Sequence, residues 1–192
     1  MMKKNKNIFL MRHGRTEWNK NKRLQGRQNS PLLESSHDEI LQTLKLLPVE
    51  EIDFVFASPL GRVIETIEIM QSKWKFVYEK NSLLMECDMG LCEGFMLEEV
   101  IRKHEAFWRK REQDKWNTPW PNGESYADIY LRASRFVEEL PNEKNILILS
   151  HEMMGKCIAG TLCNWSPEKI IEIKQTNTQI FRISDNEFTI ME

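Results

Sequence analysis

Short runs of apolar residues alternate along this chain with longer segments whose apolar residues recur at helical spacing. Three of the runs predict buried strands, at Ile8–Arg12, Phe54–Ala57 and Asn145–Leu149. A fourth run, Phe76–Tyr78, has the aromatic and β-branched residues typical of a short strand. Because the strands alternate with helical segments, the pattern predicts an α/β domain with a largely parallel sheet.

Helical periodicity is clearest where apolar positions gather on one face of an expected helix. The expected helices are Asp38–Leu47, Ser58–Gln71, Met96–Asp114, Glu124–Leu140, the segment from His151 to about Cys163, and a short one from Ser166. Ser58 and Pro59 have the residue types preferred at an N-cap and at the first helical position. A helix that begins there places Arg62 in its first turn.

The polar, glycine-containing and proline-containing stretches predict loops and one hairpin. Loops are expected at His13–Ser30, Leu83–Gly94 and Trp116–Gly123. Near the end of the chain, Ile180–Ile183 and Phe188–Met191 predict a hairpin whose turn is Asp185-Asn186.

Composition narrows the class of protein. The chain has 192 residues, 41% apolar and 29% charged, which predicts a single globular domain over residues 1–192. The formal net charge is −2, and no basic stripe or tail is present, which argues against nucleic-acid binding. The four cysteines include no Cys-x-x-Cys pair, so structural zinc is not expected.

The first residues bear on cellular location. Met1–Lys6 is basic, like the start of a signal peptide, but the apolar stretch that follows ends after four residues, at Arg12. No stretch approaches the roughly 20 apolar residues that cross a bilayer. A cytoplasmic protein without a membrane partner is therefore expected. The oligomeric state stays open, a homodimer included.

Arg12-His13-Gly14, at the end of the first strand, is the most informative feature of the chain. A neutral imidazole fixed in one tautomer can attack a phosphoryl group. The neighbouring guanidinium matches phosphate oxygens, and glycine permits a tight turn beside a ligand. Arg62, the Glu86 loop and His151 also fall at or near expected strand ends, where ligands of open α/β sheets bind.

These motifs together resemble the histidine phosphatase superfamily, in its phosphoglycerate mutase-like branch. The resemblance rests on Arg12-His13-Gly14-x-Thr16-x-x-Asn19, Arg23-Leu24-Gln25-Gly26, Ala57-Ser58-Pro59-Leu60-x-Arg62-x-x-x-Thr66, Glu86-x-x-x-Gly90-x-x-Glu93-Gly94, Pro121-x-Gly123-Glu124-Ser125 and Ser150-His151. The ordered set spans nearly the whole chain. It implies a three-layer αβα sandwich around a mostly parallel central sheet, with no metal or organic cofactor.

The resemblance also implies residue roles. His13 is expected to be the nucleophile that becomes a phosphohistidine, and Glu86 the general acid. Arg12, Arg62 and His151 are expected to bind the transferring phosphoryl group. Asn19, Gln25 and Gly26 are expected to add substrate contacts.

The family usually has glycine directly after the second histidine, and this chain has Glu152. Its charge is expected to weaken anion binding unless the side chain points away, so Glu152 is also counted among the substrate-binding residues. Asp88 and Glu93 lie close to Glu86 in the sequence and rival it as the acid, but the spacing to Gly90 and Glu93-Gly94 favours Glu86. Trp108, Trp116 and Trp120 fit a core or a cleft wall equally well.

The reaction favoured by this reading is hydrolysis of a small phosphomonoester. The first alternative is a cofactor-dependent phosphoglycerate mutase, although mutases of that kind tend to be longer, with an insertion over the site. The second is a noncatalytic module that binds a phosphorylated ligand, which Glu152 keeps open. The sequence does not identify the substrate.

Overall fold

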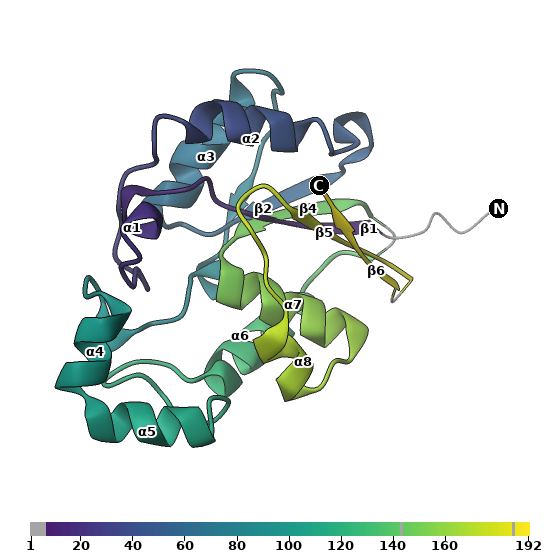
Figure 1. Ribbon diagram of the computed structural model, residues 1–192. Helices are drawn as coiled ribbons and strands as arrows, with labels where there is room; N and C mark the ends of the chain where they lie inside the picture. The colour runs from purple at the N-terminus through teal and green to yellow at the C-terminus, as the bar shows by residue number, and fades with distance from the viewer. Residues whose placement is uncertain (1–6, 143, 186) are drawn as a thin grey trace.

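A mixed sheet lies at the centre of the protein. The structure, a computed structural model, describes residues 7–142, 144–185 and 187–192. Within these ranges six strands pair in the order β3-β2-β4-β1-β5-β6 (Figure 1). Their bounds are β1 Asn7–Arg12, β2 Phe54–Ala57, β3 Glu79–Lys80, β4 Ile146–Ser150, β5 Ile180–Ser184 and β6 Glu187–Met191. The first four strands in that order pair in parallel, while β5 and β6 add the predicted antiparallel hairpin.

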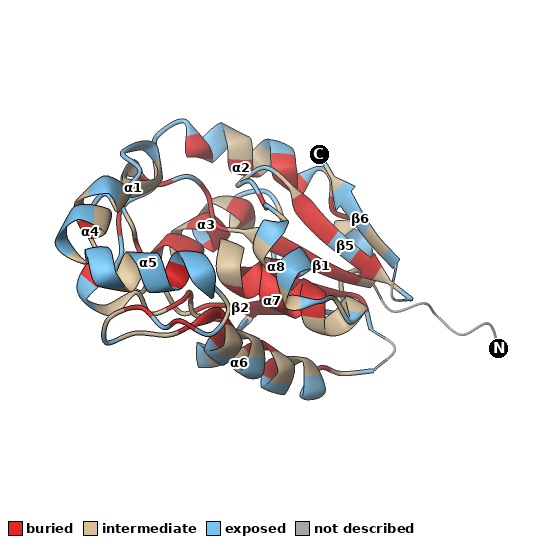
Figure 2. Ribbon diagram, turned by 60° about the horizontal axis from the view of Figure 1, so that its bottom comes forward, coloured by how far each residue is buried: buried red, intermediate tan, exposed pale blue. Residues whose placement is uncertain are grey.

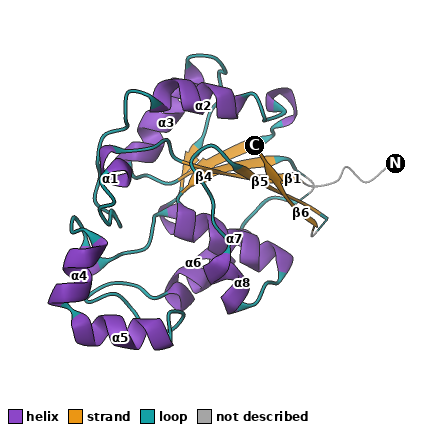
Figure 3. Ribbon diagram, viewed as in Figure 1, coloured by secondary structure: helices purple, strands orange, loops and turns teal. Residues whose placement is uncertain are grey.

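Helices cover both faces of the sheet and confirm the three-layer architecture. The helices are α1 Glu17–Lys20, α2 Ser36–Leu44, α3 Gly61–Gln71, α4 Leu97–Lys103, α5 Glu105–Gln113, α6 Tyr126–Glu138, α7 Glu152–Cys163 and α8 Pro167–Glu172. In Figure 3, α2 and α3 lie on one side of the strands, and α6, α7 and α8 lie on the other. The pair α4 and α5 extends beyond the sheet, at the end of the molecule where α1 also lies.

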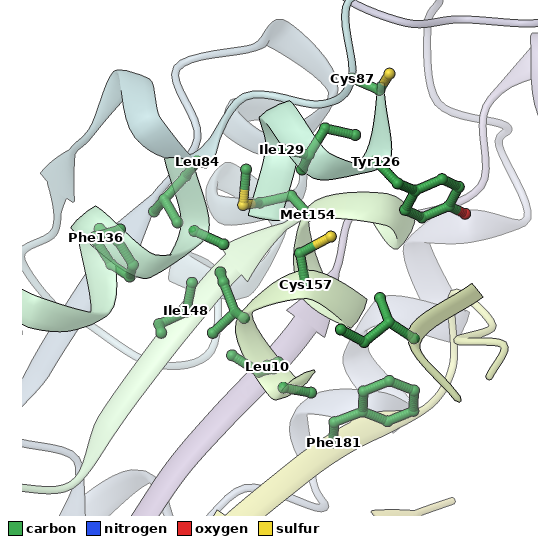
Figure 4. Packing of buried hydrophobic residues seen from close by; sticks show 14 of the residues in the cluster. Leu10, Leu84, Cys87, Tyr126, Ile129, Phe136, Ile148, Met154, Cys157 and Phe181 are labelled. Carbon is green, nitrogen blue, oxygen red and sulfur yellow. The ribbon is translucent and has the colours of Figure 1, made fainter. Parts of the chain in front are cut away.

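The core consists of two apolar layers, one on each face of the sheet. Figure 2 shows the buried faces of α3, α7 and the central strands turned toward each other. In the layer under α6 and α7, Phe136 meets Phe56 edge-on with ring centroids 5.6 Å apart. Ile148 of β4 and Met154 and Cys157 of α7 belong to the same apolar layer (Figure 4). Burying side chains of this size contributes about 1.5–3 kcal/mol each, so the core rigidly fixes where β4 ends and α7 begins.

Strand register brings the predicted site together. Arg12 pairs with Ser150, and Ala57 pairs with Leu149, so β1, β2 and β4 end at one level. The residues that follow these strands, among them His13, Ser58 and His151, therefore project from the same edge of the sheet, at its carboxyl ends.

Two predicted boundaries are wrong. The third strand is Glu79–Lys80 and not Phe76–Tyr78, because Phe76 stacks on Trp74, with ring centroids 4.2 Å apart, before the chain reaches the sheet. The helix expected from Ser58 begins at Gly61. Ser58 does not cap it, because the Ser58 hydroxyl is hydrogen-bonded to His151 and to the Leu60 amide.

Smaller differences affect the loops and the ends. The expected loop His13–Ser30 contains the one-turn helix α1, which Thr16 caps, and the helical segment Met96–Asp114 is divided at His104. Met1–Lys6 and the turn residue Asn186 lie outside the described residues. Every helix in the described ranges is too short or too polar to span a bilayer.

Candidate active site

His13 follows β1 and is 2% exposed. Its Nδ1 lies 2.7 Å from the carbonyl oxygen of Gly14, and its Nε2 lies 3.1 Å from Nε of Arg62. A carbonyl oxygen only accepts and a guanidinium only donates, so Nδ1 carries the proton and Nε2 carries the lone pair. The ring is therefore held as the neutral tautomer with a nucleophilic Nε2.

Arg62 lies in the first turn of α3, and its guanidinium is almost fully buried. Besides the bond to His13, it donates to the carbonyl oxygens of Gln28 and Gly26, at 2.7 and 2.8 Å. Burial lowers the pKa of Arg62 to about 10, so the group stays charged near neutral pH. Burying the Arg62 guanidinium costs free energy, and its bonds to carbonyl oxygens offset only part of that cost. The site therefore favours an anionic ligand, which offsets more of it.

His151 follows β4 and faces His13, with ring centroids 5.3 Å apart. Its Nε2 lies 2.8 Å from Oγ of Ser58, and that oxygen also accepts from the Leu60 amide. In the tautomer in which the Ser58 hydroxyl donates to Nε2, the ring proton of His151 is on Nδ1. Among the described residues this buried Nδ1 has no partner, so it is a donor left for a ligand.

Arg12 completes the cationic group. Its Nη1 donates to the carbonyl oxygen of Gln175 at 2.9 Å and lies 2.8 Å from Oε2 of Glu152. Its Nε is buried and has no partner in the described part of the chain. Arg12, His13 and Arg62 line one cavity, and the fully buried His151 lies against His13 without lining the cavity itself.

Both imidazoles are held neutral. Burial is the main cause that lowers the pKa of His13 well below 6.5, and the charges of Arg62 and Arg12 add to it. For His151 burial again lowers the pKa most, followed by Arg62 and His13. A neutral His13 is the form required of a nucleophile.

Glu86 is 8% exposed and lines the same cavity as His13. Its carboxylate accepts from the amides of Cys87, Met153 and Met154 at 3.0–3.3 Å. The rival acids are engaged elsewhere. Asp88 pairs with Arg27, and Glu93 binds the amides of Arg27, Gln28 and Met89.

Arg132 on α6 holds the Glu86 segment in place, a role that sequence reasoning missed. Its guanidinium donates to the carbonyl oxygens of Leu83, Met85 and Glu86, and it pairs with Glu124 at 2.9 Å. An irregular segment needs such anchors because its carbonyl groups have no strand partner. The amphipathic pattern of α6 gave no sign of it, since only tertiary structure brings Arg132 to these carbonyls.

The expected substrate contacts all line the cavity, which has a volume of about 320 Å³. Asn19 also closes the capping box of α1 with Thr16, and Nε2 of Gln25 donates to Oγ1 of Thr16 at 2.7 Å. Gly26, with φ +51°, is a position where a Cβ would strike Glu93. Direct contact of Asn19, Gln25 and Gly26 with phosphate stays a prediction.

The far wall of the cavity comes from α5 and the loop after it. Trp108, Trp120, Arg111 and Lys115 line it, whereas Trp116 stacks on Tyr126 and packs against Tyr130 with the rings tilted. The sequence left open whether these tryptophans belong to core or cleft, and the structure divides them. Nothing in the sequence indicates that Arg111 and Lys115 belong to the cavity. The charged residues of this segment show no pattern that separates side chains facing the cavity from those facing solvent.

Metal chemistry has no evident donor set here. In the described ranges, no group of three or more His, Cys, Asp or Glu side chains is arranged to hold a metal ion.

Comparison with known families and sequences agrees with this geometry. The model of the histidine phosphatase superfamily (branch 1) matches residues 8–191. A 6-phosphofructo-2-kinase/fructose-2,6-bisphosphatase of Caenorhabditis elegans is 30% identical over 155 residues, which cover 80% of this chain and 33% of that protein. The human enzyme 3 of that name is 31% identical over 171 residues, 87% of this chain and 31% of the relative. The chain thus spans about a third of the length of these relatives.

Solved structures show the same fold. The α-ribazole phosphatase of Shigella flexneri superposes with a TM-score of 0.85 at 21% identity, covering 96% of this chain and 94% of the other. A mycobacterial glucosyl-3-phosphoglycerate phosphatase gives 0.83 at 18% identity, with 97% and 96% covered.

Proposed function

Because this chain belongs to the histidine phosphatase superfamily, we propose that it hydrolyses small phosphomonoesters through a phosphohistidine on His13. The observation that carries the proposal is the arrangement around Nε2 of His13. The proton is on Nδ1, and Arg62, Arg12 and His151 surround the nucleophilic nitrogen with donors. Phosphoryl transfer needs mainly such positioning and charge stabilisation.

The proposed reaction has two steps. Nε2 of His13 attacks phosphorus, the bond to the leaving oxygen breaks, and the carboxylic acid of Glu86 gives its proton to that oxygen. The Glu86 carboxylate then takes a proton from water as the water oxygen attacks phosphorus and the N–P bond breaks. Orthophosphate leaves, and His13 is neutral again. The arginines hold the equatorial oxygens throughout.

The proposal includes a substrate class. Arg111 is 3% exposed and lines the cavity, and its Nη1 donates to the carbonyl oxygen of Thr118 at 2.7 Å. In the part of the chain that the structure describes, no carboxylate lies at ion-pair distance from it. Lys115 lines the same wall, and burial followed by the charge of Arg111 lowers its pKa. Two cations on the cavity wall, neither of which has a carboxylate at ion-pair distance among the described residues, favour a substrate with a second anionic group.

Two further observations support that class. Nε1 of Trp120 is buried and has no hydrogen-bond partner among the described residues. The Trp120 ring centroid lies 4.3 Å from Cζ of Arg111, and both side chains line the cavity. The relatives whose names include fructose-2,6-bisphosphatase are named for a doubly phosphorylated compound. We therefore propose bisphosphates or phosphorylated carboxylic acids as substrates, without choosing among them.

The experiment combines turnover with labelling. Wild-type protein is expected to release phosphate from 4-nitrophenyl phosphate and to show acid-labile label after a quench with a ³²P-labelled substrate. His13→Ala is expected to lose both, while His37→Ala, a change at an exposed position, is expected to keep both. If the wild type takes up no label and releases no phosphate, a noncatalytic binding module is the better description.

Hydrolysis is separated from mutase activity with 3-phosphoglycerate. Release of phosphate is expected to outrun isomerisation to 2-phosphoglycerate. The reverse order would make the mutase the correct reading.

The setting of the reaction is also proposed. Residues 1–192 act as one domain in the cytoplasm, without nucleic acid; the formal net charge of −2 and the four free cysteines support this setting.

A further inference from the structure

Glu152 places a carboxylate on a cation of the phosphoryl site. It is the first residue of α7, directly after His151. Its Oε2 lies 2.8 Å from Nη1 of Arg12, and both residues line the cavity. A carboxylate and a phosphoryl group are recognised by the same guanidinium donors. A phosphoryl group that reaches Arg12 therefore meets a negative charge already bound there.

The two partners differ in how firmly they are held. Arg12 is anchored, because the same Nη1 also donates to the carbonyl oxygen of Gln175 at 2.9 Å, and its side chain is 15% exposed. The Glu152 side chain is 32% exposed and has no other hydrogen-bond partner among the described residues. When an anion arrives, Glu152 can turn toward solvent while Arg12 stays in place.

We propose that Glu152 competes with the phosphoryl group for Arg12 and thereby lowers the affinity of the site for phosphorylated ligands. The inference rests on the proposed function in taking Arg12 as a phosphoryl ligand. The competition weakens binding of ligands that carry one anionic group, orthophosphate included. The competition costs every ligand the same free energy at Arg12, so a ligand with a second anion, which also binds Arg111 and Lys115, keeps the higher affinity. Return of the carboxylate to Arg12 also favours departure of orthophosphate after hydrolysis.

The direct test is binding of orthophosphate, measured by titration calorimetry at low ionic strength on wild type and three variants. Glu152→Gln removes the charge and keeps the size of the side chain. Glu152→Asp keeps the charge but shortens the side chain by one methylene, which withdraws it from Arg12. Glu172→Gln, at an exposed position on α8, makes the same change of net charge away from the cavity. Circular dichroism confirms that each variant is folded.

We expect Glu152→Gln and Glu152→Asp to bind orthophosphate about two- to fivefold more tightly than wild type, the range of a partly exposed ion pair. Glu172→Gln is expected to match wild type. Unchanged or weaker binding in Glu152→Gln would overturn the proposal, as would an equal gain in Glu172→Gln. If Glu152→Asp binds orthophosphate as weakly as wild type does, the negative charge near the site and not the contact with Arg12 weakens binding. That result would also overturn the proposal.

Turnover is measured separately on the same proteins. If no protein hydrolyses phosphomonoesters while Glu152→Gln still gains affinity for orthophosphate, the proposed function fails and the competition stands. If no variant binds orthophosphate, the competition fails whatever the turnover.

Discussion

Nε2 of His151 lies 2.8 Å from Oγ of Ser58, although 93 residues separate the two along the chain. The serine follows β2, and the histidine follows the neighbouring strand β4. The bond orients the imidazole so that its unpartnered Nδ1 carries the proton. Ser58, which the sequence predicts to cap a helix, therefore positions His151.

Replacing Ser58 with alanine is expected to lower kcat by about 10- to 100-fold, because a misplaced donor costs that much when the chemistry depends on position. Ser58→Thr keeps the hydroxyl and is expected to restore much of kcat. Steady-state kinetics with 4-nitrophenyl phosphate measure both variants. Equal activity in Ser58→Ala and wild type would contradict this role for the hydroxyl.

Glu86→Gln is expected to slow poor leaving groups most. Loss of a general acid costs about 10²–10⁴-fold where the leaving oxygen needs its proton. An alkyl phosphate is expected to lose activity in this range, and 4-nitrophenyl phosphate about tenfold or less. The measurement is kcat/KM over a series of leaving groups. Parallel losses across the series would assign Glu86 a different role.

Arg111→Ala and Lys115→Ala are expected to impair substrates with a second anion selectively. Hydrogen bonds to charged groups are worth about 1.5–3 kcal/mol, so KM for a bisphosphate rises about 10- to 100-fold. KM for 4-nitrophenyl phosphate is expected to change less than about threefold. Lys110→Ala, on the exposed side of α5, is the matched control. A uniform effect on both substrates would count against a second anionic subsite.

The two buried histidines are expected to make stability pH-dependent. Their lowered pKa values mean that, below pH 6.5, the unfolded chain binds protons that the folded protein excludes. The free energy of unfolding therefore falls as the pH falls, by up to about 1.4 kcal/mol per pH unit for each histidine. His13→Gln is expected to reduce this slope by about one proton. Urea denaturation at pH 7, 6 and 5 provides the slopes, and identical slopes in both proteins would refute the buried neutral state of His13.

Apolar runs and helical periodicity were enough to predict the layers of the fold and the order of most elements. These signals are local, because a buried strand or helix face must be apolar wherever its partner lies. The same reasoning failed at Phe76–Tyr78, where aromatic residues stack on Trp74 and do not join the sheet. It failed again at Ser58, which was predicted to cap a helix but is hydrogen-bonded to His151.

The sequence by itself determined the chemical groups of the site, because His13, Arg62, Glu86 and His151 stand in recognisable local motifs. Only the tertiary structure decided what surrounds them. It assigned the His13 proton to Nδ1, anchored the Glu86 segment with Arg132, and turned Arg111 inward. The reason is physical: hydrogen bonds and burial depend on groups far apart in the chain, whereas propensity and periodicity report only on neighbours along it.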